Sequence, residues 1–337
     1  MKKIPSPLVS LIPLIVLVAL LFATIRTFGS DALSGGSQVS LLTTTAVCVL
    51  IGMGFYKIGW KDFELAITNN ITGVSSALII LLIIGALSGA WMISGVVPTL
   101  IYYGIQIIHP SFFLTSTCII CALVSVMTGS SWTTIATIGI ALMGIGKAQG
   151  FEEGWIAGAI ISGAYFGDKI SPLSDTTILA ASVTDTPLFK HIRYMLITTV
   201  PSLIITLIIF TVAGLSHNAG NTEHIAEFSA ALAGKFHITL WLLIVPIGTG
   251  ILIARRVPSI ITLFLSAALA GVFAVFFQPD LLQEISGAQN SEGIQSIFKG
   301  LMMTLYGGTS LQTSNEALTE LVATRGMAGM MNTVWLI

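Results

Sequence analysis

Apolar stretches of up to about 20 residues recur along this 337-residue chain, and few charged residues interrupt them. Apolar residues make up 54% of the chain and charged residues only 9%, whereas a soluble domain carries about a quarter charged residues. Most of the surface must therefore face something other than water, and we expect an all-α polytopic transmembrane helical bundle. The net charge of −1 argues against a nucleic-acid partner.

The apolar stretches predict where the chain enters the lipid bilayer. They are Ser10–Ile25, Val39–Phe55, Val74–Trp91, Phe112–Met127, Thr134–Ile145, Trp155–Phe166, Thr176–Val183, Met195–Leu215, Ile238–Ala254 and Ile260–Phe277. Thr134–Ile145 and Thr176–Val183 are too short to cross alone. Short or interrupted hydrophobic segments are the best sequence indication of a transporter's binding site.

Positive charge in the loops predicts a cytoplasmic N-terminus. The basic residues that we assign to the cytoplasmic side are Lys2, Lys3, Lys57, Lys61, Lys190, His191, Arg193, Arg255 and Arg256. All of these residues can lie on the cytoplasmic side only if one apolar element between Phe112 and Phe189 does not cross the membrane. We expect Phe112–Ile145 to be a re-entrant hairpin with its tip at "TGSSWTT", Thr128–Thr134. A hairpin around "DKISPLSD" gives the same number of membrane crossings and remains the alternative.

The segment "GDKISPLSD", Gly167 to Asp175, places three charges within an apolar region. Each Asp or Lys at the centre of a membrane helix costs about 2.5–3.5 kcal/mol on insertion scales. Asp168, Lys169 and Asp175 must therefore face protein, one another or a water-filled cavity. Pro172 lacks a backbone donor and clashes with the preceding turn, so we predict a broken helix here, with Gly167 also at the break.

The break supplies oxygen ligands that suit Na+ or a bound proton. They are the freed carbonyl groups together with the side chains of Asp168, Asp175, Ser171, Ser174 and Thr176. Lys169 would tune the electrostatics of this site. The competing interpretation is a loop outside the membrane, in which Ser174 or Asp175 only caps the following helix. Both interpretations can hold together, because a capping Asp can also bind an ion.

Two further motifs accompany this segment. In "TGSSWTT", Gly129 permits a tight turn, and Ser130, Ser131 and Thr133 offer hydroxyl groups for ion binding, although such hydroxyls often only bond back to their own helix. In "GALSGAWMISGVVP", Gly85 and Gly89 form a small-residue face for close helix packing. Gly95 and Pro98 are placed to interrupt that span, and Trp91 lines a cavity or anchors the helix.

The sequence favours transport over catalysis. Cys48, Cys118 and Cys121 lie in apolar segments without a second ligand pair, so we interpret them as small buried hydrophobic residues and expect no cofactor. The two aspartates lie on one segment, unlike the facing pair of an aspartyl protease. There is no H-E-x-x-H metalloprotease motif, and there is no filter motif of a channel.

Three motifs, "SGAYFGDKISPLSDTT", "TGSSWTTIATIG" and "IGALSGAWMISGVVPTLIYYG", resemble the NhaC family of bacterial Na+/H+ antiporters in their order and spacing. The resemblance implies Na+/H+ exchange across the bacterial cytoplasmic membrane, with hairpin tips that meet broken helices at the midplane. Relatives in the same superfamily exchange malate plus protons for Na+ and lactate, so small organic anions remain alternative substrates. Family members are usually longer, and we expect residues 1–337 to be a single transmembrane domain lacking its C-terminal part. Whether the protein is a homodimer is left open.

Overall fold

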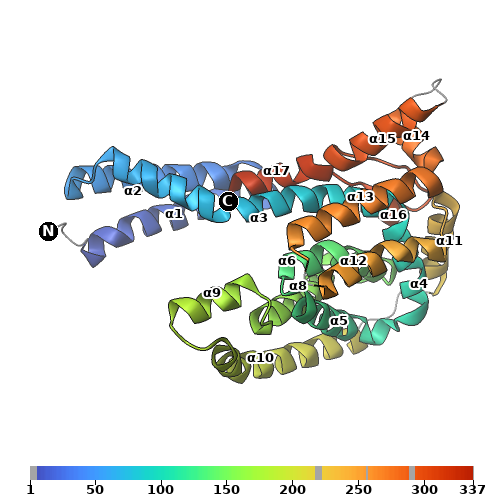
Figure 1. Ribbon diagram of the computed structural model, residues 1–337, viewed down its shortest axis with the longest axis horizontal. Helices are drawn as coiled ribbons and strands as arrows, with labels where there is room; N and C mark the ends of the chain where they lie inside the picture. The colour runs from blue at the N-terminus through green and yellow to red at the C-terminus, as the bar shows by residue number, and fades with distance from the viewer. Residues whose placement is uncertain (1–5, 217–221, 256, 288–292, 337) are drawn as a thin grey trace. The chain divides into compact units, whose positions relative to one another are not determined.

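All regular elements in the described part of the chain are helices, as the apolar pattern predicts. The computed structural model describes residues 6–216, 222–255, 257–287 and 293–336, and the N-terminal Lys2 and Lys3 lie outside this description. The described residues form no sheet, and a single antiparallel bridge joins Thr309 to Thr324. The all-α prediction is confirmed (Figure 1).

Six described helices are long and apolar enough to cross a bilayer. They are Pro7–Phe28, Gly36–Tyr56, Trp60–Ile93, Pro110–Thr128, Leu188–Ser216 and Ser259–Phe277. At about 1.5 Å per residue, even the shortest of them spans close to the hydrocarbon thickness of about 30 Å. The pair Ile225–Lys235 and Leu240–Ala254 is bent by 91° and together forms a further candidate span. The protein is therefore a multi-pass membrane protein.

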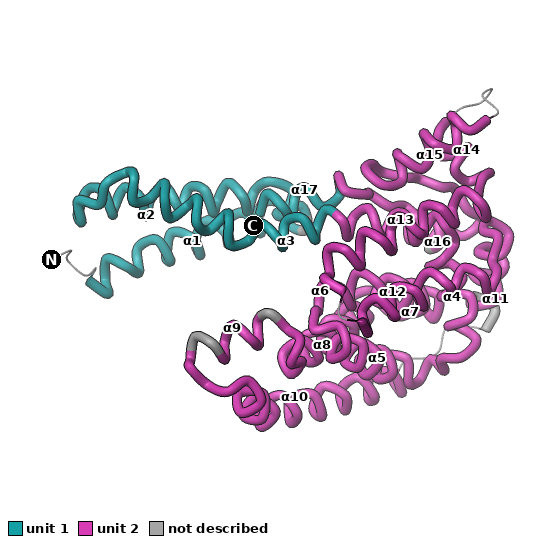
Figure 2. Tube along the Cα trace, in the orientation of Figure 1, with its two compact units in different colours: residues 1–82, 329–337 teal, residues 83–328 magenta. Residues whose placement is uncertain are grey.

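The chain divides into two compact units, which Figure 2 colours separately. The first comprises residues 1–82 and 329–337. Within it, α1 (Pro7–Phe28) and α2 (Gly36–Tyr56) pack together around the short 3₁₀-helix η1 (Gly29–Ser34). Polar groups connect them, because the hydroxyls of Thr24 and Ser40 lie 2.9 Å apart. The buried Gln38 amide donates to the carbonyl of Leu33 at 2.8 Å.

The second unit comprises residues 83–328 and contains every predicted ion-binding residue. Its first segment is the end of α3 (Trp60–Ile93), whose Gly85 and Gly89 pack against backbone carbonyls of Gly326 and Thr304. Gly95 adopts φ +85° and separates α3 from α4 (Val96–Ile107). The predicted packing face and the predicted interruption are both present.

Trp91 is a buried anchor of this unit. It is 2% exposed, and its indole N–H donates to Ser266 Oγ at 2.9 Å. Ser266 in turn lies 2.6 Å from Thr249 Oγ1, so one hydrogen-bonded chain joins α3, α13 (Ser259–Phe277) and α12 (Ile244–Ala254). A satisfied polar chain of this kind fixes the relative register of three helices, because each unpaired buried group would be costly.

A helical hairpin occupies residues 113–148. The helix α5 (Phe113–Thr128) ends at Gly129, and the return leg consists of α6 (Ser131–Thr134), the π-helical turn η3 (Ile135–Gly139) and α7 (Ile140–Ala148). The next helix, α8 (Glu153–Ile170), runs parallel to α5. Hydrogen bonds fix that direction, since Ser125 Oγ donates to the Ala164 carbonyl at 2.5 Å and Ser171 Oγ to the Val126 carbonyl at 2.8 Å. The hairpin form is as predicted, and its depth in the membrane stays a prediction.

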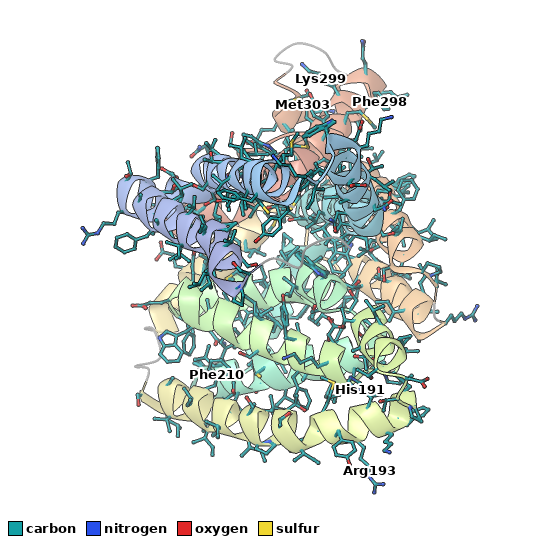
Figure 3. The ribbon with its side chains drawn as sticks, turned by 90° about the vertical axis from the view of Figure 1, so that its left-hand side faces the viewer. His191, Arg193, Phe210, Phe298, Lys299 and Met303 are labelled. Atoms are coloured by element: carbon teal, nitrogen blue, oxygen red, sulfur yellow. The ribbon has the colours of Figure 1, made fainter. Side chains whose placement is uncertain are left out.

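The chain then continues through shorter and longer helices. After the break at 171–174 come α9 (Asp175–Val183), α10 (Leu188–Ser216), α11 (Thr222–Lys235), η4 (Leu240–Leu243), α12, α13, α14 (Pro279–Ser286), α15 (Ile294–Tyr306), α16 (Glu316–Val322) and α17 (Gly326–Leu336). Both α5 and α10 pack against α8, and Phe210 of α10 (labelled in Figure 3) meets the ring of Trp155 edge-on. Consequently α8 lies between two neighbours, with a different face toward each.

Candidate functional site

The tip of the hairpin meets the break between α8 and α9. Gly129 adopts φ +68°, in the left-handed region that glycine tolerates. A Cβ at this position would lie 2.7 Å from both the carbonyl carbon and the Cβ of Leu173. Glycine is therefore required twice, by the backbone conformation and by the approach of the neighbouring chain. The two predicted motifs, distant in sequence, form one local structure.

One side-chain hydrogen bond joins the two motifs directly. The hydroxyl of Ser131 donates to Oδ2 of Asp168 at 2.8 Å. Ser131 is 3% exposed, and Asp168 is partly buried. Ser131 begins the helical run that ends at Ala148, and the N-terminus of a helix favours a nearby negative charge. Among the described residues, Oδ1 of Asp168 receives no hydrogen bond, so this oxygen is available to a cation or a proton.

The break itself is anchored by buried hydroxyl groups. Ser171 donates to the Val126 carbonyl of α5 at 2.8 Å and accepts from the backbone N–H of Leu173 at 3.2 Å. Ser174 accepts from the N–H of Thr177 at 3.4 Å, which makes it the N-cap of α9. Both serines are fully buried. The capping role considered for Ser174 is therefore present, and ligation by either serine stays a prediction.

The remaining predicted residues lie around this junction in different roles. Ser130 caps α6, because its Oγ accepts from the N–H of Thr133 at 3.2 Å and from the Thr133 hydroxyl at 3.1 Å. Thr176 is exposed, and its hydroxyl lies 2.9 Å from that of Ser174. The side chain of Asp175 lies outside the described residues.

Two expectations about individual residues need qualification. Gly167 does not lie at the break, because α8 continues to Ile170. Its lack of a side chain serves packing instead, since a Cβ there would lie 2.5 Å from the Ala122 carbonyl oxygen of α5. Lys169 is exposed, and within the described residues no ion pair links it to a carboxylate. Asp168 and Lys169 are neighbours in sequence but point to different surroundings.

Comparison with known proteins shows to which protein family the chain belongs. A family model described as "Na+/H+ antiporter family" matches residues 163–337, which include the C-terminal end of α8, the break and α9. The chain belongs to this family. The Na+/H+ antiporter family assignment agrees with the resemblance to NhaC proteins carried by the three motifs, and that resemblance is confirmed.

Individual relatives extend the match over the N-terminal half. The Malate-2H(+)/Na(+)-lactate antiporter of Bacillus subtilis is 36% identical over 342 residues, covering 100% of this chain and 68% of the relative. The Na(+)/H(+) antiporter NhaC of Alkalihalophilus pseudofirmus is 38% identical over 296 residues, 86% of this chain and 60% of the relative. NhaC of Bacillus subtilis is 36% identical and is likewise covered over 60% of its length. The chain thus spans between 60% and 68% of the length of these antiporters. No solved structure matches it.

Two threonines at the antiporter junction were not singled out from the sequence. Thr177 is 3% exposed, and its hydroxyl lies 3.2 Å from the carbonyl oxygen of Asp168 and 3.0 Å from that of Lys169. It thereby satisfies carbonyls at the open end of α8. Thr128 accepts from the N–H of Ser130 at 3.2 Å and stabilises the tip. Thr177 could have been identified from the sequence, because it lies three residues after Ser174. The backbone N–H at that position donates a hydrogen bond to the side chain of an N-cap residue.

Proposed function

We propose that the protein acts as a secondary active transporter that exchanges Na+ for H+ across the bacterial cytoplasmic membrane, with its N-terminus in the cytoplasm. The observation that carries this proposal is the Ser131–Asp168 hydrogen bond at the meeting point of a hairpin tip and a helix break. Family membership and the names of the NhaC relatives support the choice of ions. A junction of broken backbone is where transporters bind their coupling ions.

Asp168 is the central ligand in this proposal. A carboxylate inside a membrane protein can be neutralised by a proton or by a sodium ion, and competition between the two couples their movements in opposite directions. Ser131 stabilises the ionised carboxylate by donating its hydroxyl hydrogen, while its oxygen lone pairs remain available to a cation. Asp175, Ser130, Thr133, Ser171, Ser174 and Thr176 are the proposed surrounding ligands, and Lys169 is proposed to tune the local charge.

Substitution of Asp168 tests the proposal. The full chain would be reconstituted in liposomes containing a pH-sensitive dye, and proton efflux or uptake would be recorded after an external Na+ pulse. We expect Asp168→Asn to abolish the Na+-dependent signal because an amide cannot exchange a proton for a cation. Asp31→Asn, which changes an exposed aspartate in η1, serves as the matched control and should retain exchange. Unchanged exchange in Asp168→Asn would remove this residue from the mechanism.

A second function is Na+-coupled exchange of organic acids. The specific observation in its favour is the malate/lactate antiporter of Bacillus subtilis, whose match covers the whole of this chain. Liposomes loaded with malate distinguish the two functions. Organic-acid exchange requires external lactate and Na+ to release the malate, whereas Na+/H+ exchange proceeds without either acid.

A further inference from the structure

Two basic residues, Lys190 and Arg193, lie in the first two turns of α10. Both side chains are exposed, and Figure 3 shows Arg193 projecting from α10 into open space. Within the described residues, neither of them forms an ion pair. Asp185 in the preceding loop is also exposed and pairs with neither of them. The described part of the protein therefore leaves both cations without a counter-charge.

Helix stability does not explain this basic pair. The N-terminus of a helix carries a partial positive charge, which favours acidic side chains in the first turn and disfavours basic ones. The first turn of α10 has no acidic residue, and Lys190 lies there instead. The charges of Lys190 and Arg193 must therefore be balanced by groups outside the protein.

Beyond the basic pair, the same face of α10 continues as an apolar stripe. Positions three, four or seven residues apart return to one face of a helix. Such steps from Lys190 reach Ile197, Ile204, Ile208, Val212 and Leu215. These side chains are 52–66% exposed, and α10 is one of the helices long and apolar enough to span a bilayer. In a membrane this stripe therefore faces the hydrocarbon of the lipid.

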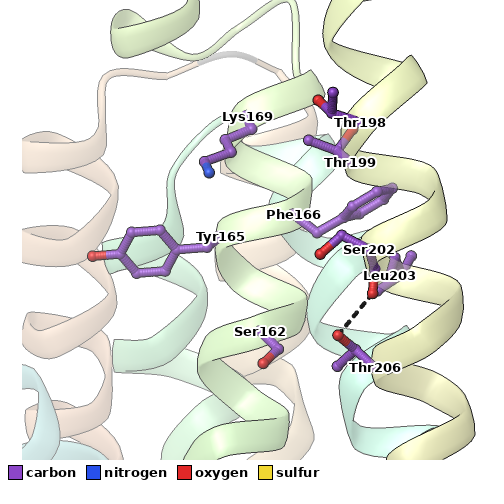
Figure 4. A pocket seen from close by; sticks show the side chains of 9 residues that line it. All are labelled: Ser162, Tyr165, Phe166, Lys169, Thr198, Thr199, Ser202, Leu203 and Thr206. Carbon is purple, nitrogen blue, oxygen red and sulfur yellow. Dashed lines mark hydrogen bonds between the residues drawn. The ribbon is translucent and has the colours of Figure 1, made fainter.

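A different face of α10 is turned toward α8, so packing fixes which face meets the lipid. Phe210 is 6% exposed. Ser202 and Thr206 line a pocket shared with Ser162 and Phe166 of α8 (Figure 4). In that pocket the Thr206 hydroxyl donates to the Ser202 carbonyl at 2.8 Å. The hydroxyl groups of α10 thus lie toward α8, and the apolar stripe is left to the lipid.

We propose that Lys190 and Arg193 bind the phosphodiester headgroup of an anionic phospholipid, whose acyl chains lie along the apolar stripe of α10. Side chains three residues apart on a helix have Cβ atoms about 5–6 Å apart, so both can reach one phosphate. Arginine contacts phosphate through two parallel N–H groups, and lysine adds a point charge. The aliphatic stems of both side chains cover apolar surface, while their charged ends extend toward the membrane surface.

Two exposed aromatic rings flank the basic pair. Phe189 is 75% exposed and Tyr194 is 65% exposed. Tyr194 follows Lys190 by four residues and therefore lies on the same face of α10. Tyrosine is enriched at the level of lipid headgroups, because its ring is apolar and its hydroxyl is polar. The two rings thus lie at the depth where a headgroup meets its acyl chains.

The combination of charge and apolar surface selects among anions. Inorganic phosphate or a nucleic acid would contact Lys190 and Arg193 but would leave the stripe beside them uncovered. A zwitterionic phospholipid would cover the stripe, but its own ammonium group weakens its attraction to the basic pair. An anionic phospholipid matches both surfaces with one molecule. The lipid site does not involve Asp168, so it is tested independently of the proposed ion exchange.

Fluorescence quenching at single positions in liposomes tests the proposal. The full chain, with its native cysteines replaced by alanine, would carry a fluorophore on Ile197→Cys or on Leu215→Cys. The liposomes would consist of phosphatidylcholine with a small fraction of phosphatidylglycerol whose brominated acyl chains quench the fluorophore on contact. Ile197 lies about 10 Å from Lys190 along the helix axis, and Leu215 lies on the same stripe about 27 Å farther along.

The quenching measures how strongly each lipid associates with each position. At Ile197 we expect brominated phosphatidylglycerol to associate about 25-fold more strongly than brominated phosphatidylcholine, because each basic residue near an anionic headgroup contributes about a fivefold gain. We expect no such preference at Leu215, because the C-terminal half of α10 carries no basic residue. Equal preferences at the two positions would overturn the site. Loss of the preference in millimolar inorganic phosphate would show a soluble ligand and overturn the assignment to a lipid.

Matched variants connect the preference to the two side chains. Lys190→Gln combined with Arg193→Gln should abolish the preference at Ile197 without lowering the midpoint of thermal unfolding, because both side chains are exposed. Lys190→Arg keeps the charge and should retain the preference. Lys57→Gln combined with Lys61→Gln removes the same charge from exposed residues assigned to the same side of the membrane, and should leave the preference unchanged. An equal loss in the two double variants would show a general effect of surface charge and refute the site.

Discussion

At the residue scale, the geometry around Asp168 depends on a few small side chains. Ser131 is the one donor that the described residues supply to the Asp168 carboxylate, and it reaches Asp168 from a helix 37 positions earlier in the chain. Gly129, two residues before Ser131, allows the chain to turn. Neither residue type is unusual in a membrane helix, so their importance follows from their neighbours.

Removing the Ser131 hydroxyl should weaken sodium binding without unfolding the protein. A hydrogen bond to a charged group contributes about 1.5–3 kcal/mol, and we expect Ser131→Ala to raise the Na+ concentration required for half-maximal exchange about tenfold. The measurement is the Na+ dependence of dye-reported proton movement in liposomes. Ser75→Ala, on an exposed face of α3, should leave that concentration unchanged. An identical Na+ dependence in both variants would contradict a role for Ser131.

Adding one methyl group at Gly129 should destabilise the protein. The left-handed conformation costs a non-glycine residue about 1–2 kcal/mol, and the new Cβ would also collide with the backbone of Leu173. We expect Gly129→Ala to lower the midpoint of thermal unfolding in detergent and to impair exchange. Gly73→Ala is the control, because a Cβ there meets nothing within 4 Å and alanine favours a helix. Equal midpoints for the two variants would show that the tip tolerates displacement.

At the element scale, the parallel pair α5 and α8 holds the tip and the break at the same level. Gly163 and Gly167 of α8 lie against the carbonyl groups of Cys118 and Ala122. Small residues let two membrane helices approach closely, since lipid supplies no hydrophobic driving force between them. The buried Cys118 and Cys121 belong to this packed face, which agrees with their interpretation as small buried hydrophobic residues. The same interpretation is wrong for Cys48, which is exposed on α2.

Enlarging Gly163 should separate the two helices. We expect Gly163→Val to destabilise the protein by about 1–3 kcal/mol, the usual cost of overpacking, and to reduce exchange because Asp168 moves away from Ser131. Gly158→Val tests the same substitution on the same helix, where the nearest atom to a Cβ is Phe210 at 3.9 Å. Thermal unfolding and exchange rates of the two variants provide the comparison. The prediction is refuted if Gly158→Val is the more damaging change.

At the scale of the whole molecule, the charge pattern predicts an orientation that can be measured. Lys57 and Lys61 are assigned to the cytoplasm. The segment 278–298 carries acidic and no basic residues, and we therefore expect it to lie outside. After replacement of the native cysteines by alanine, single cysteines at Lys61 and at the exposed Ile294 would be treated with a membrane-impermeant maleimide. We expect labelling of Ile294→Cys in intact cells and of Lys61→Cys only after permeabilisation. The opposite pattern would invert the proposed topology.

The sequence by itself determined the class of the protein and the interruptions at Gly95, Gly129 and Pro172. The low charge content requires a lipid-facing surface, and Pro172, Gly95 and Gly129 end helices for local reasons that act through the backbone. Only the tertiary structure decided which groups meet. The Ser131–Asp168 bond and the packing role of Gly167 depend on contacts between elements that are far apart in the chain. A local pattern encodes where a helix stops, but the partner of a side chain is set by how the helices pack.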